Sequence, residues 1–234
     1  MVTGSAKEIR ISPRRVAFAL TVAAALLLVA HLGLLLIAAT TGHDYIFGVA
    51  PLFNLDGERN VPSFFSGCLL LLNGILFWLV AHRPALTRGA VWYVLAAVFV
   101  FLAYDELFGI HERLTPPIRT ALHTTGLLYY AWIIAYAVPL LALIGWFIPT
   151  WRTLEAPARR RLTVAGVLYF LGAIVMEMIG GAYDEAFGRR TLSWGLLVAV
   201  EESLELAGLV VLAHTLLMLL RPSAGGAPIV VDTK

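Results

Sequence analysis

The 234-residue sequence contains little charge and almost no cysteine. Only 14% of its residues are Asp, Glu, Lys or Arg, and Cys68 is its single cysteine. One cysteine can neither close an intramolecular disulfide nor supply a cysteine-based zinc site, so small domains stabilised in these two ways are excluded. Because Cys68 stands in an apolar run, we interpret it as a packing residue.

Signatures of several common cofactors are missing as well. The sequence has no Gly-x-Gly-x-x-Gly, which argues against a nicotinamide or flavin held in a Rossmann-type site. Its six histidines are too few for the histidine boxes of membrane desaturases. The Glu-x-x-His of soluble di-iron proteins is also absent, since Phe108 stands three residues before His111. The arginines follow the ends of apolar runs, so we expect no nucleic-acid partner.

Apolar residues dominate what is present. They make up 60% of the chain, and the mean hydropathy is +0.84, which is more apolar than a soluble core requires. A spanning helix needs about 20 apolar residues. Such stretches are separated by proline and glycine, and they cover residues 15–40, 63–82, 90–112, 120–148, 162–183 and 192–220. We therefore predict an all-α, polytopic membrane helix bundle of about six transmembrane helices.

The distribution of basic residues predicts how this bundle is oriented. The first apolar run is longer than the core of a signal peptide, so we expect it to remain as an uncleaved helix. Twelve of the 17 Lys and Arg residues fall on the side of the N-terminus, which predicts cytoplasmic termini in the cell inner membrane. We expect a cytoplasmic tail at 1–14, one transmembrane domain at 15–221 with an external loop at 41–62, and a cytoplasmic tail at 222–234.

The informative residues are acids inside the predicted spans. A carboxylate at a helix centre costs roughly 2.5–3.5 kcal/mol even on lenient insertion scales, so such side chains face protein or water and usually mark function. Asp105 and Glu112 lie seven residues apart and would share one line of the third span. Glu177 and Asp184 repeat this interval in the fifth span, and the sixth carries an acidic stripe of its own. We expect these lines to meet in the outer half of the bundle.

We predict that this cluster binds a divalent metal ion. Carboxylates and imidazoles from facing helices build the metal sites of helical bundles, and oxygen-rich ligation favours Fe, Mn or Zn as the cofactor here. The metal would activate oxygen or water against a lipid, a quinone or another apolar small molecule, which is the expected partner. The predicted ligands are Asp105, His111, Glu112, His123, Glu177, Glu201 and Glu205. Secondary candidates are Glu58, Asn60, Glu106, Asp184 and Glu202.

Two alternatives remain open for the same residues. The acids would carry protons or cations if polar residues continued inward to the other face. They would be structural, or serve a partner subunit, if each had an arginine partner. The aromatics of the fourth span, Tyr129, Tyr130, Trp132 and Tyr136, either line a substrate pocket or pack the bundle.

The chain also resembles a family of uncharacterised bacterial multi-pass membrane proteins. The resemblance rests on Asp56-Gly-Glu58-Arg-Asn60-Val-Pro62, on Asp105-Glu106 followed by His111-Glu112, and on Glu201-Glu202 followed by Glu205. It covers about residues 50–215 and implies no particular reaction. It does imply that Glu58 and Asn60 fold over the acidic cluster. Taken from the residues alone, the same loop equally suits a turn that caps the following helix.

Overall fold

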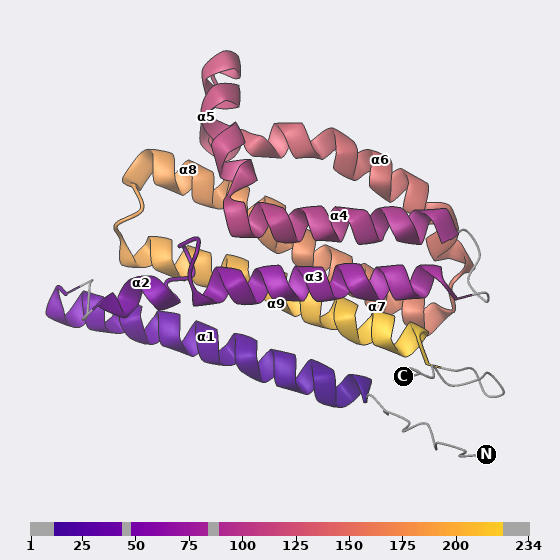
Figure 1. The fold of residues 1–234 in the computed structure, drawn as a ribbon. Coiled ribbons are helices and arrows are strands. Elements are labelled where there is room, and N and C mark those ends of the chain that lie inside the picture. Colours follow the sequence, from indigo (N-terminus) through magenta and orange to yellow (C-terminus); the bar gives the residue numbers. More distant parts are fainter. Residues whose placement is uncertain (1–11, 44–47, 84–88, 222–234) are drawn as a thin grey trace.

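The computed structural model describes residues 12–43, 48–83 and 89–221, and within them the chain forms helices and connections with no strand (Figure 1). The predicted all-α class is confirmed. The expectations for residues 1–11, 44–47 and 222–234 lie outside the described residues. The helices are α1 (Pro13–Thr41), α2 (Ala50–Phe53), α3 (Val61–Ala81), α4 (Gly89–Phe108), α5 (Ile110–Leu122), η2 (Gly126–Leu128), α6 (Trp132–Thr153), α7 (Ala156–Phe170), the π-helix η3 (Leu171–Met176), α8 (Glu177–Phe187) and α9 (Leu192–Leu219).

Five helices in the described ranges are long and apolar enough to cross a membrane. They are α1, α3, α4, α6 and the continuous helix from Ala156 to Phe187. Their outward faces carry large apolar side chains. For example, Phe18 is 71% exposed, Val138 is 73% exposed and Leu141 is 68% exposed. In water such surfaces would be unfavourable, whereas lipid tails are as apolar as the side chains themselves. These features are typical of a multi-pass membrane protein.

The long helices run side by side, and the bundle has two distinct ends (Figure 1). At one end, here called the far end, α1 begins at Pro13, α9 ends at Leu219, and α6 turns into α7. At the other end, here called the site end, α2, α5 and the α8–α9 connection lie together. α5 projects out of the bundle there and does not run along α4 and α6 (Figure 1).

α9 is the central helix of the bundle, because it packs against α1, α3, α7 and η3. At the far end the core is mainly apolar, with Trp92 and Val80 fully buried beside Leu216, and its buried polar side chains include Thr150 and Thr215. At the site end the core is aromatic and includes Tyr130 and Trp194. The character of the interior therefore changes along the bundle from aliphatic to aromatic and polar.

One buried histidine joins three elements at the site end. His31 of α1 is 2% exposed. Its Nε2 lies 3.2 Å from the carbonyl oxygen of Gly195 in α9, and the backbone N–H of Leu55 donates to its Nδ1 at 3.2 Å. This pattern suits a neutral imidazole with its proton on Nε2. His31 thereby fixes α1 and the α2–α3 loop to the start of α9.

The third and fourth predicted spans differ from the structure. α4 ends at Phe108, because Gly109 takes a left-handed conformation with φ of 59°, and the chain turns into α5. The prolines at 116 and 117, expected to separate two spans, lie inside α5. The next long helix begins only at Trp132. The predicted span 90–112 therefore ends too late, and the predicted span 120–148 begins too early.

Candidate functional site

The site end contains a cavity of about 100 Å³ whose lining includes seven acids. Its walls come from the α2–α3 loop, α4, α5, α8 and α9, so segments far apart in sequence meet there. Two basic side chains, His111 and Arg189, also face it. The lining carboxylates are Asp56, Glu58, Glu106, Glu112, Glu177, Glu201 and Glu202. An excess of acids over bases in one cavity favours the binding of a cation.

The π-helix η3 brings α8 close to α9 just before Glu177. Gly172 of η3 is buried, and a Cβ added to it would lie 2.9 Å from both the carbonyl oxygen of Glu201 and the backbone nitrogen of Glu205. Only glycine permits so close an approach of the two backbones. Short π-helical segments often occur at functional sites, where they change the direction of the side chains that follow. Here the segment sets Glu177 opposite Glu201.

The Asp105 and His111 side chains form an ion pair across the α4–α5 break. Nδ1 of His111 lies 3.1 Å from Oδ1 of Asp105, which also accepts the backbone N–H of His111 at 2.8 Å. Burial lowers the pKa of His111, but the hydrogen bond and charge of Asp105 outweigh this and raise it to about 9. His111 is therefore a cation at neutral pH and neutralises Asp105, the acid nearest to it.

The α2–α3 loop lies over the same break. The carboxylate of Glu58 sits directly on Gly109, where a Cβ would overlap it. Burial raises the pKa of Glu58, and the nearby charge of Glu112 raises it further. Asn60 forms a capping box with Ser63 at the start of α3, accepting the Ser63 N–H at 3.0 Å. Each interpretation therefore fits one residue, since Glu58 lines the cavity whereas Asn60 caps α3 and does not line it.

Aromatic side chains of the α5–α6 connection and α6 donate hydrogen bonds to several acids. The Trp132 indole donates to Glu177 at 2.9 Å, and the Tyr136 hydroxyl donates to Asp105 at 3.1 Å. The Tyr130 hydroxyl donates to Asp184 at 2.6 Å. Three of these aromatic side chains therefore hydrogen-bond the acidic cluster. Neither of the two predicted roles, packing the bundle or lining an apolar substrate pocket, requires such hydrogen bonds.

Arg189 is the one arginine that forms an ion pair among the described residues. Its Nε lies 2.8 Å from Oδ2 of Asp184, and its guanidinium stacks on the rings of Tyr130 and Trp194. By contrast, Glu201 and Glu202 of α9 have no ion-pair partner in the described part of the chain. In their ionised form, these two partly accessible carboxylates are therefore not neutralised by an ion pair with any described residue.

The predicted site residues divide into three groups. His111, Glu112, Glu177 and Glu201 face the cavity together, as do the secondary candidates Glu58, Glu106 and Glu202. Asp105, Glu205 and Asp184 lie around the cavity and do not line it. His123 is exposed and ends α5 in a left-handed conformation, so the expectation that it begins a helix beside the cluster is wrong.

Glu112 reaches the cavity for a different reason from the one predicted. The expected alignment with Asp105 on one helix line fails, because the helix stops at Gly109 between them. Asp56 and Trp194 also line the cavity and were not predicted. Asp56 could have been recognised from its place two residues before Glu58. Within the described ranges, no three His, Cys, Asp or Glu side chains are grouped as metal ligands.

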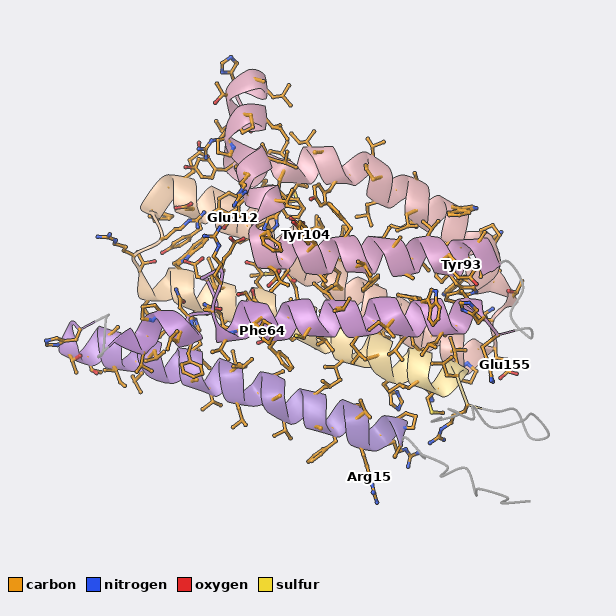
Figure 2. The ribbon with its side chains drawn as sticks, viewed as in Figure 1. Arg15, Phe64, Tyr93, Tyr104, Glu112 and Glu155 are labelled. Atoms are coloured by element: carbon orange, nitrogen blue, oxygen red, sulfur yellow. The ribbon has the colours of Figure 1, made fainter. Side chains whose placement is uncertain are left out.

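Away from the site end, acids are rare. Among the described acids, only Glu155 lies at the far end, where it precedes α7 (Figure 2). Asn73 is fully buried midway along α3 and donates to the carbonyl oxygens of Leu69 and Leu209. A continuous series of titratable groups from the cavity to the far end is therefore absent from the described residues.

Comparison with known families matches residues 19–220 to the family described as "Domain of unknown function (DUF8692)". The chain belongs to this family. No curated protein and no solved structure matches it. The resemblance to an uncharacterised family is confirmed at this level, and the family match spans both the acidic cavity and all the long helices.

Proposed function

We propose that this family member is a six-span protein of the bacterial plasma membrane, with cytoplasmic termini and a cavity that opens on the outer side. α9 would be the sixth span, since its 28 residues exceed the roughly 20 that a membrane requires. α1 begins and α9 ends at the same end of the bundle (Figure 1), as an even number of spans requires. The excess of arginine at that end supports a cytoplasmic assignment.

We further propose that the cavity is a cation site whose occupant is a divalent metal ion. One observation carries this proposal. The carboxylates of Glu177, Glu201 and Glu202 form no ion pair in the described part of the chain, while His111 and Arg189 are paired with Asp105 and Asp184. Uncompensated carboxylates in a confined site are unfavourable unless a cation or protons neutralise them. Carboxylate oxygens on facing helices are typical ligands of Fe, Mn and Zn.

The residues around the cavity suit a metal-dependent reaction. A bound metal would supply Lewis acidity or activate oxygen or water toward a lipid or quinone. Trp132 holds Glu177 by its indole N–H at 2.9 Å, which fixes the direction of that carboxylate. The charged His111 stands beside the acids and would help to orient an anionic group of the substrate. The large apolar cluster around Trp92 and Leu216 would keep the acidic cavity separate from the cytoplasm.

Elemental analysis of the purified protein tests this proposal. The variant Glu177→Gln/Glu201→Gln keeps the shape of both side chains and removes their charge. Glu155→Gln/Glu185→Gln is the matched control, because neither side chain lines the cavity. We expect stoichiometric Fe, Mn or Zn in the parent and the control, and its loss in the cavity variant.

Metal-free protein that also fails to take up added Fe, Mn or Zn would refute the metal proposal. The same acids would then be neutralised by protons, and proton flux in liposomes would become the measurement that decides between transport and a structural role. Metal retained equally by all three proteins would place the metal elsewhere in the chain.

A further inference from the structure

The far end of the bundle contains a second, larger cavity with the opposite charge. Its volume is about 460 Å³, within the range of roughly 300–1,000 Å³ that small-molecule sites occupy. It lies where α1, α7 and α9 meet, and α9 packs against both of the other helices. The lining side chains are Ser12, Arg14, Arg161, His214, Met218 and Arg221.

Among the described residues, no carboxylate pairs with the three arginines of this cavity. No Asp or Glu lines it, and the ion pairs found in the described part of the chain involve neither Arg14, Arg161 nor Arg221. The Nη2 of Arg83 donates to the carbonyl oxygen of Arg221 at 2.6 Å, which adds a fourth cation nearby and fixes the end of α9. Guanidinium groups gathered in this way are well suited to hydrogen-bond an anion such as a phosphate.

The start of α1 adds to the attraction for an anion. Ser12 is its N-cap, yet the Ser12 side chain makes no capping hydrogen bond and lines the cavity instead. The first N–H groups of a helix and its dipole favour negative charge. Guanidinium groups and a helix start together are well suited to a phosphate.

Apolar side chains continue from the arginines along the bundle. On α1, Phe18 follows Arg14 by four residues and is 71% exposed; on α7, Val164 follows Arg161 by three residues and is 44% exposed. Residues three or four apart share one helix face, so each arginine stands at the head of an exposed apolar stripe. A ligand that fits this surface has an anionic head and long apolar chains.

We propose that this cavity binds the phosphate headgroup of an anionic phospholipid, with its acyl chains along α1 and α7. Basic pockets between membrane helices at the cytoplasmic side are suited to such headgroups. The cavity lies where α1 begins and α9 ends, which is the end of the bundle that we propose to face the cytoplasm. This site is independent of the acidic cavity and would hold even if that cavity bound no metal.

Native mass spectrometry of the detergent-purified protein with added lipid tests the proposal. Phosphatidylglycerol is the probe, phosphatidylcholine is the neutral-headgroup comparison, and glycerol phosphate is the free anion without acyl chains. The test variant is Arg14→Gln/Arg161→Gln/Arg221→Gln. The matched control is Arg15→Gln/Arg152→Gln/Arg160→Gln, which removes three exposed arginines from the same end.

We expect phosphatidylglycerol to bind the parent and the control with similar Kd and the test variant at least about tenfold more weakly. An equal loss in both triple variants would show a general attraction to basic surface and overturn the specific site. If phosphatidylcholine bound as tightly as phosphatidylglycerol, the proposal of an anionic headgroup would be refuted. If glycerol phosphate bound as tightly, a lipid would be refuted as the occupant. Should the triple variant not fold, Arg161→Gln and Arg160→Gln form the same comparison with single changes.

Discussion

Replacing Gly172 by alanine tests the close contact between η3 and α9. The added Cβ would meet backbone atoms of Glu201 and Glu205 at 2.9 Å, and backbone cannot swing aside as a flexible side-chain end can. Forcing such overlap typically costs about 1–3 kcal/mol. Alanine itself favours a helix over glycine by roughly 0.5–1 kcal/mol, which offsets part of that cost. We therefore expect Gly172→Ala to lower the free energy of unfolding by about 1–2 kcal/mol.

Gly166 of α7 is the matched control for this experiment. It lies in the preceding helix, and a Cβ added there would meet nothing within 4 Å. We expect Gly166→Ala to be neutral or stabilising by up to about 1 kcal/mol, since only helix propensity changes. Unfolding in mixed micelles, followed by circular dichroism, would measure both variants. If Gly172→Ala were as stable as Gly166→Ala, the argument that this glycine permits the close approach of α9 would be wrong.

Two further predictions concern the α4–α5 break and the start of α3. The pKa of His111 is about 9 in the folded protein and 6.5 in the unfolded chain, so its protonation favours the folded state. This contribution of up to about 3 kcal/mol is fully present below pH 6.5 and is lost as the pH rises through 9. Asp105→Asn should flatten thermal stability between pH 6.5 and 9; an unchanged slope would contradict the pairing. Asn60→Ala should lower the unfolding free energy by about 1–2 kcal/mol through loss of the cap. Asn60→Asp keeps the capping oxygen but loses the hydrogen bonds that Nδ2 donates to the carbonyl oxygens of Asn54 and Pro51, so it should recover only part of that stability in the same assay.

The sequence predicts the long helices and the meeting of acids well, because both follow from general constraints. A bilayer requires long apolar runs, and buried acids must face one another or water. The positions of Glu177 and Glu201 opposite each other therefore follow from helix periodicity and from their depth in the bundle. The structure places both on the same cavity.

The failures arise where one glycine decides the path of the chain. Periodicity assumes a continuous helix through residue 112, yet Gly109 adopts φ of 59° and redirects the chain into α5. The change from apolar to polar residues after Gly109 was the available signal. The π-helix before Glu177 has no equivalent signal, because it results from the packing of Gly172 against α9. Such tertiary causes cannot be read from local sequence.

The contact between the first and last long helices has a consequence for biosynthesis. α1 is synthesised well before its main partner α9, and His31 meets Gly195 across 164 residues. The nascent chain must therefore hold α1 in the bilayer without this partner until α9 has been made. A chain that stopped before residue 192 would leave the Nε2 of His31 without the carbonyl oxygen that it contacts in the complete bundle.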